Sequence, residues 1–166
     1  MIHNKKCRAF FLTLPLLCCA SLLFAADLVK PAPPVSLKFV PAAGAKAGST
    51  VDATIEVTIK KPWHIFGANP GVEGLTPVEF SMDSCTGATV EKIVLSKPST
   101  VYSKVFEKNL SLYEDKMTVT LTLKIAEGTS GKVPLQGTFH YQACSDTTCL
   151  PPKREPLMAA QILENP

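Results

Sequence analysis

The sequence predicts an all-β protein that folds as an antiparallel β-sandwich. Residues 51–60 and 117–125 alternate without error between apolar and polar side chains, which is typical of strands with one buried face. Roughly seven to nine short segments are separated by regular turn signals, and none has the period of a helix. The 14 prolines also argue against long helices.

The first 25 residues are expected to be a signal peptide. A basic start at residues 5–8 precedes an apolar run over 9–24, and small residues follow for cleavage. Cys18 and Cys19 raise the alternative of a lipid-anchored form, but the residues before them fit a lipid-attachment signal poorly. A soluble secreted form is therefore favoured, with an extended, proline-containing leader over 26–34 and one domain over 35–166.

Removal of the signal peptide changes the charge and the cysteine count. The whole-chain charge of +3 comes from three basic residues of the signal, so 14 basic and 14 acidic residues remain. A neutral domain gives no electrostatic reason to bind nucleic acid or an anionic membrane. Neither a nucleotide-binding glycine pattern nor a metalloprotease helix is present. Three cysteines remain, Cys85, Cys144 and Cys149, which in an oxidising compartment means one pair and one free thiol.

The first half of the domain is expected to contain four strands and a short aromatic run. The strands are a short edge strand and then three longer ones, with a turn over 83–87 between the last two. In order, these segments are 36–40, 51–60, the aromatic run 63–66, 77–82 and 88–95.

The second half is expected to contain three strands after a long loop. Residues 97–109 show no clean period and are interpreted as a loop that carries Tyr102 and Phe106. The strands that follow are 117–125, 133–142 and 157–163.

Cys144 and Cys149 are separated by four residues, between the last alternating strand and a Pro-Pro pair. A bridge that closes so short a loop stabilises a fold by only ~2 kcal/mol, so it indicates chemistry more than stapling. If the strand over 133–142 continues, Cys144 lies on its polar face and is accessible at the end of the sheet. Asp146 disfavours a thiolate here while the basic residues 153–154 favour one, and both outcomes stay open.

These residues carry a resemblance to a known family. The order Tyr-Gln-Ala-Cys, four residues, Cys-Leu-Pro-Pro over 141–152 resembles the N-terminal periplasmic domain of the thiol–disulfide interchange protein DsbD. The likeness covers about 36–163, including the aromatic run 63–66 and the residues 112–116 that lead into the second alternating strand.

The resemblance implies an immunoglobulin-like sandwich with a redox-active cysteine pair. Such domains take electrons from a membrane-embedded partner and pass them to periplasmic thioredoxin-like proteins. By motif position, Cys149 forms the mixed disulfides and Cys144 resolves them. A mobile cap loop covers the disulfide with an aromatic residue, here Phe106, and the aromatic run places His64 and Phe66 beside the site. The implied protein is a periplasmic, monomeric thiol–disulfide oxidoreductase or electron carrier without cofactor or metal.

The chain departs from the family pattern in three respects. Its cysteines have four intervening residues where the best-known members have five. Lys104 and Val105 replace an acidic pair before the cap aromatic. The membrane-spanning and thioredoxin-like parts of the full protein are absent, so the electron donor is expected to be a separate protein.

Two other classes of function stay open. One is a secreted immunoglobulin-like binding module in which the disulfide is a local staple. The other is a copper-handling domain that uses Cys144 and Cys149 with His140 or Met158, because thiolates and thioethers suit Cu(I). Parity places His140 on the face of Cys144 but ~13 Å from it, so it is interpreted as a solvated strand residue. Cys85 is interpreted as an isolated or buried thiol.

Overall fold

The computed structural model describes residues 32–164, and the regular secondary structure in this range consists of β-strands. No helix in these residues is long and apolar enough to cross a membrane. The expected signal peptide over 1–25, and most of the expected leader over 26–34, lie outside the described residues. The strands are β1 Val35–Val40, β2 Thr50–Ile59, β3 His64–Phe66, β4 Glu79–Cys85, β5 Ala88–Leu95, β6 Ser99–Ser103, β7 Lys108–Glu114, β8 Lys116–Ile125, β9 Lys132–Tyr141, β10 Ala143–Cys144 and β11 Lys153–Ile162.

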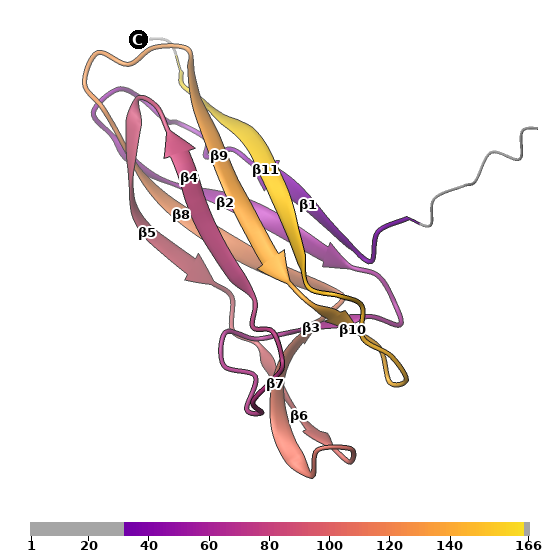
Figure 1. Ribbon diagram of the computed structural model, residues 1–166. Helices are drawn as coiled ribbons and strands as arrows, with labels where there is room; N and C mark the ends of the chain where they lie inside the picture. Colours follow the sequence, from indigo (N-terminus) through magenta and orange to yellow (C-terminus); the bar gives the residue numbers. More distant parts are fainter. Residues whose placement is uncertain (1–31, 165–166) are drawn as a thin grey trace, which may run out of the picture. The chain divides into compact units, whose positions relative to one another are not determined.

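The strands form three antiparallel sheets, of which the two largest by strand pairing make the immunoglobulin-like sandwich. The first sheet has the order β1-β2-β8-β5 and the second the order β11-β9-β4. A small third sheet, β10-β3-β7-β6, lies at one end of the sandwich, and its β6–β7 hairpin projects from that end (Figure 1). The predicted all-β sandwich is confirmed.

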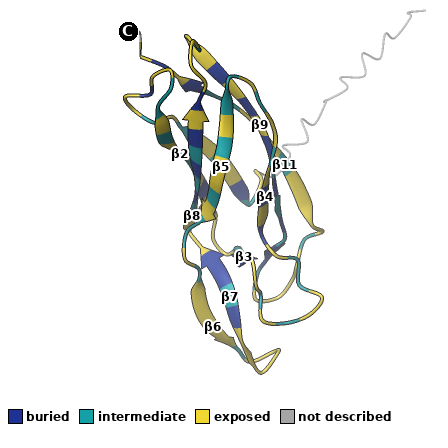
Figure 2. Cartoon of the chain, turned by 90° about the vertical axis from the view of Figure 1, so that its left-hand side faces the viewer, coloured by how far each residue is buried: buried dark blue, intermediate teal, exposed yellow. Residues whose placement is uncertain are grey.

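The core lies between the two large sheets and follows the alternation in the sequence. Every second residue of β8, from Met117 to Ile125, is buried, and the same holds for β2 from Ala53 to Ile59. These faces pack with buried side chains of β9, among them Leu135 and Phe139. Figure 2 shows the resulting alternation of buried and exposed positions along the strands. Burial of these apolar side chains is the main stabilising contribution to the fold.

The interpretation of 97–109 as a long loop is wrong. Residues 99–103 form β6 and pair with β7, so that Ser99 lies opposite Leu112 and Ser103 opposite Lys108. Four of the five residues of β6 are exposed, because β6 is an edge strand that projects beyond the sandwich (Figure 2). A strand held mainly by backbone pairing, with no side buried in the core, leaves no apolar alternation in its sequence.

Two predicted strand boundaries also differ from the structure. β4 runs on to Cys85, through an irregularity between Met82 and Ser84, where a turn over 83–87 was expected. β11 begins at Lys153, directly after the Pro-Pro pair, rather than at Leu157. In both places the residues pair with β9, and this long partner extends the strands beyond their apolar segments.

The predicted accessibility of Cys144 is the most consequential error. The strand over 133–142 does not continue: β9 ends at Tyr141, and the chain enters the third sheet as β10. Gln142, between the two strands, accepts a hydrogen bond from the backbone N–H of Thr76 (3.4 Å) and donates one to the carbonyl of Leu150 (3.1 Å). Because the change of sheet breaks the alternation, Cys144 is buried, with 1% of its surface exposed.

Candidate functional site

Cys144 and Cys149 face each other across a tight turn and form a disulfide. The Ser145 N–H donates to the carbonyl of Thr148 (2.7 Å), and the Leu150 N–H donates to the carbonyl of Ala143 (2.9 Å). The Ser145 hydroxyl also accepts a hydrogen bond from the Thr148 N–H (3.2 Å). Short polar side chains that bond to their own backbone favour such turns. The local sequence therefore places the two sulfurs opposite each other.

The disulfide is the end of a row of residues that crosses the third sheet. Cys149 lies opposite Cys144, Cys144 opposite His64 of β3, and His64 opposite Glu114 of β7. Residues that are directly opposite in adjacent antiparallel strands present their side chains on the same face of the sheet. Two sulfurs, an imidazole and a carboxylate thus share one face and line one cavity.

The two cysteines differ sharply in exposure. Cys144 is buried among apolar residues, and it packs in a small cluster with Phe66, Leu110 and Leu112. Cys149 is exposed on the outer arm of the turn. Cys149 is therefore the more accessible of the two cysteines, whereas Cys144 is shielded.

A cavity of about 620 Å³ opens beside the disulfide. The cysteine turn borders it, and so do β3 and the β6–β7 hairpin, which contributes Val101, Tyr102, Val105 and Phe106. All four of these apolar side chains are more than 40% exposed. The hairpin thus presents an exposed apolar surface next to the reactive sulfurs.

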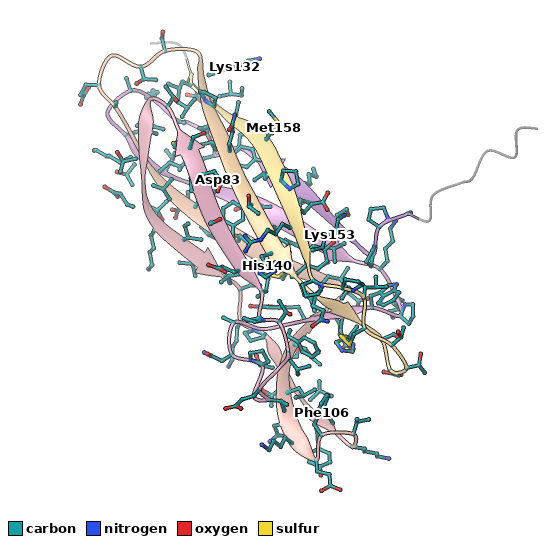
Figure 3. The ribbon with its side chains drawn as sticks, in the orientation of Figure 1. Asp83, Phe106, Lys132, His140, Lys153 and Met158 are labelled. Carbon is teal, nitrogen blue, oxygen red and sulfur yellow. A yellow bond between two sulfur atoms is a disulfide. The ribbon has the colours of Figure 1, made fainter. Side chains whose placement is uncertain are left out.

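Phe106 lies at the tip of the β6–β7 hairpin (Figure 3). It lines the same cavity as both cysteines, and 42% of its surface is exposed. The adjacent Glu107 adopts a left-handed backbone conformation (φ 52°), which completes the turn back into β7. The hairpin tip has no core contact among the buried clusters of residues 32–164, which suits an element that moves.

His64 is half-buried, and its ring meets the ring of Phe66 edge-on, with 5.5 Å between the ring centroids. Burial lowers the pKa of the His64 imidazole, and the negative charges of Glu114 and Asp146 partly oppose this. Lys104 is the cation that lines the cavity. The site therefore combines an imidazole of lowered pKa with two carboxylates, Glu114 and Asp146.

The structure brings together all five of the predicted site residues, Cys144, Cys149, Phe106, His64 and Phe66, around one cavity. Of the charged residues near the motif, Asp146 lines the cavity, whereas Lys153 does not line it and forms an ion pair with Glu155. Glu114 was not identified from the sequence as a site residue. Its cross-strand neighbour His64 is 50 positions away in the chain numbering, and no local pattern signals such a pairing.

The ligand set considered for copper is not assembled. His140 lies opposite Arg154 and Glu79 in the second sheet, Met158 lies opposite Gln136, and neither His140 nor Met158 lines the cavity (Figure 3). Among residues 32–164, no group of three or more His, Cys, Asp or Glu residues is arranged to hold a metal ion. Cys85 is a half-buried free thiol at the end of β4, and burial raises its pKa.

Nine chains among the solved structures are similar to this chain, and three of them illustrate the likeness. The N-terminal domain of Neisseria meningitidis DsbD in its reduced form is 14% identical, with a TM-score of 0.49, and the match covers 82% of this chain and 92% of that one. The N-terminal periplasmic domain of Proteus mirabilis ScsB is 18% identical, with a TM-score of 0.49, over 75% and 44%. The complex between the DsbD and PilB N-terminal domains of N. meningitidis matches at 18% identity and a TM-score of 0.46, over 80% and 87%.

A search of curated proteins finds no match to this chain. In contrast, the family model described as thiol:disulfide interchange protein DsbD, N-terminal, matches residues 30–160, which is most of the chain and includes the cysteine turn, the row across the third sheet and the β6–β7 hairpin. The chain therefore belongs to the family of the N-terminal domain of the thiol:disulfide interchange protein DsbD.

Proposed function

We propose that this domain relays electrons in the periplasm through a reversible Cys144–Cys149 disulfide. It accepts electrons from a membrane-embedded donor and passes them to thioredoxin-like proteins. The observation that carries this proposal is the pairing of an exposed Cys149 with a buried Cys144 beside an open cavity. One sulfur is available to a partner, and the other is held in reserve for the second step.

The transfer takes place in two exchanges that balance. The Cys149 thiolate of the reduced domain attacks a sulfur of the partner's disulfide. A bond forms between these two sulfurs, and the partner's other sulfur leaves as a thiolate. Cys144 Sγ then attacks Cys149 Sγ, the intermolecular bond breaks, and the partner leaves with both sulfurs reduced. Two electrons have moved to the partner, and the Cys144–Cys149 disulfide has formed. A dithiol of the donor reverses these steps to recharge the domain.

The residues around the cavity control access to the sulfurs. Phe106, at the tip of the hairpin, acts as a cap that must move before a partner reaches Cys149. His64 and Phe66 line the floor of the site. Such a cap is a gate: it limits which thiols exchange with the disulfide without taking part in the chemistry.

The proposal also includes how the protein reaches the periplasm. Residues 1–25 act as a cleaved signal peptide, and 35–166 work as a monomeric domain in an oxidising compartment. The alternative of a secreted binding module with a structural staple predicts a different redox behaviour, which the measurements below separate.

Trapping tests the roles of the two cysteines. A thioredoxin-like protein that lacks its own resolving cysteine is first activated as a mixed disulfide with thionitrobenzoate, which is the leaving group when a thiolate attacks. It is then incubated with the Cys144→Ala variant, and Cys149→Ala is the matched control. We expect a stable mixed disulfide with Cys144→Ala, because the exposed Cys149 remains. A stable adduct that forms only through Cys144 would reverse the assignment.

The reduction potential tests the function itself. A structural staple resists reduction by glutathione and has a potential below about −300 mV, whereas a carrier has a higher potential and exchanges quickly. We expect the higher value, measured by equilibration with glutathione buffers. A potential below about −300 mV would favour the binding module.

A further inference from the structure

The resolving step requires Cys144 to lose a proton in a place that solvent hardly reaches. Only 1% of Cys144 is exposed, and Phe66, Leu110 and Leu112 pack around it. Apolar surroundings disfavour a thiolate, yet the thiolate is the nucleophile in disulfide exchange. When a partner is bound to Cys149, it covers the cavity further. A group of the protein must therefore accept the proton.

We propose that His64 accepts the proton of the Cys144 thiol in the resolving step, and that Glu114 stabilises the imidazolium that forms. This inference rests on the proposed electron-relay function and gives His64 a catalytic role beyond lining the site. Its basis is the row across the third sheet, in which Cys144, His64 and Glu114 are successive cross-strand neighbours on one face.

His64 is the group best suited by position and basicity. It is the direct neighbour of Cys144 on β3, whereas Glu114 is one strand further away. An imidazole, with an ordinary pKa of 6.5, is a stronger base than a carboxylate, whose ordinary pKa is about 4. Burial keeps His64 neutral near pH 7 and thus ready to take a proton.

The charges around His64 favour the transfer. Besides His64 itself, the charged side chains that line the cavity are Glu114 on β7, Asp146 in the cysteine turn, and Lys104 in the hairpin turn. The two carboxylates raise the pKa of His64 against the effect of burial, and so they stabilise an imidazolium more than a neutral ring. A nucleophile, a base and a carboxylate that supports the base form the arrangement by which buried thiols and hydroxyls are commonly activated. Lys104 is not part of the row, so its positive charge does not stand between Cys144, His64 and Glu114.

The step balances as follows. The proton moves from Cys144 Sγ to the His64 imidazole, which gives a thiolate–imidazolium pair. The thiolate attacks Cys149 Sγ, the Cys144–Cys149 bond forms, and the bond from Cys149 to the partner breaks. The partner's sulfur leaves as a thiolate and takes the proton from the imidazolium. His64 returns to its neutral state.

Reaction of the reduced domain with dithionitrobenzoate tests this role, because each of the two exchanges releases one coloured thiolate. The wild-type reference and every variant carry Cys85→Ser, since Cys85 is a free thiol that would release a third. The first release reports the attack by Cys149, and the second reports resolution by Cys144. We expect His64→Gln to slow the second phase at least about tenfold near pH 7, and to slow it much more than the first phase. The matched control is His140→Gln, which removes a histidine outside the cavity and should leave both phases unchanged.

The pH dependence gives a second readout. In the wild type, the second phase should level off above the pKa of His64, since the proton is then shared within the Cys144–His64 pair. In His64→Gln it should keep rising, by about tenfold per unit of pH, with the thiolate fraction of an unassisted thiol. If the Gln variant does not fold, His64→Phe keeps an aromatic ring against Phe66 and lacks the base.

One result would contradict the role of His64, and a different result would contradict the relay function. A second phase in both His64 variants that matches the wild type in rate and pH profile would overturn the role of His64 and leave the relay function intact. A wild-type protein that shows no second release at all would overturn the relay function, because Cys144 would then not resolve a mixed disulfide.

Discussion

The two cysteines of the disulfide differ in exposure, although only four residues separate them. Cys144 belongs to β10 and is covered by Phe66 and Leu112, whereas Cys149 lies on the outer arm of the turn. The same covalent group therefore has one accessible and one protected end. Such an asymmetry gives a disulfide a direction of reaction, because the accessible sulfur is attacked first.

This asymmetry predicts the order of alkylation in the reduced domain. We expect iodoacetamide to modify Cys149 well before Cys144, since access and thiolate character both favour the exposed thiol. Cys85, half-buried and with a raised pKa, should also react slowly. Peptide mass spectrometry at several times of reaction measures the order. Equal rates at Cys144 and Cys149 would contradict the protection of Cys144.

The lowered pKa of His64 predicts how stability depends on pH. Burial is the main cause of the shift, so the unfolded chain takes up the proton at a higher pH than the folded domain. The stability that comes from neutral His64 is present above pH 6.5 and is lost as the pH falls from there through the folded pKa. We expect denaturant unfolding to show this loss in the wild type and a flatter profile in His64→Gln. A wild-type stability that rises on acidification through this range would contradict the sign of the shift.

At the scale of elements, the β6–β7 hairpin is distinct from the rest of the domain. It projects from the end of the sandwich (Figure 1), and its tip carries the exposed Val105 and Phe106. Its strands are joined by backbone pairing from Ser99 to Lys108, which keeps the hairpin intact while its tip is free of the core. The tip of the hairpin is thus suited to move over the disulfide while β7 stays paired with β3.

This arrangement predicts the effect of removing the Phe106 ring. Burial of a whole Phe side chain stabilises by about 1.5–3 kcal/mol, so half-burial is worth on the order of 1 kcal/mol, or about fivefold in rate. We expect Phe106→Ala to keep its fold and to speed reduction of the disulfide by glutathione by about that factor. Stopped-flow measurement of the reduction gives the rate.

A matched control separates the position of Phe106 from its apolar character. Met158 is even more exposed, at 79%, and lies on β11 outside the cavity, so Met158→Ala should reduce at the wild-type rate. Equal rates for Phe106→Ala and the wild type would show that Phe106 is no cap.

At the scale of the whole molecule, the core holds the fold and the disulfide adds little. The two large sheets bury a continuous set of apolar side chains, among them Leu121 and Phe139. The disulfide spans a sequence separation of only five residues at the edge of the third sheet. The bridge can therefore open and close without loss of the structure that positions it.

This difference predicts the order of stability among three proteins. The Cys144→Ala/Cys149→Ala variant should lose only ~2 kcal/mol of its free energy of unfolding and stay folded at 25 °C. Leu121→Ala, which leaves a cavity in the core, should lose about 2–5 kcal/mol. Thermal melts followed by circular dichroism measure both. Global unfolding of the double cysteine variant at 25 °C would identify the bridge as a staple.

The sequence by itself determined the sandwich and the location of its chemistry. The alternation over 51–60 and 117–125 predicted β2 and β8, because a strand at the surface of a core buries every second side chain. The spacing of Cys144 and Cys149 predicted a short bridge, since a turn of four polar residues closes on itself. Both signals are local, so they can be read from neighbouring residues.

The resemblance to the family already placed Phe106, His64 and Phe66 beside the disulfide. Only the tertiary structure decided that Cys144 is buried and that Glu114 joins the site. The change of sheet at Gln142 buried Cys144, against the parity of the preceding strand, and placed it opposite His64, which in turn lies opposite Glu114. These pairings join segments far apart in the chain, and they depend on which strands become neighbours in the third sheet. Alternation reports whether a strand has a buried face but carries no information about its partners, and for that reason the row that completes the site could not be read from the sequence.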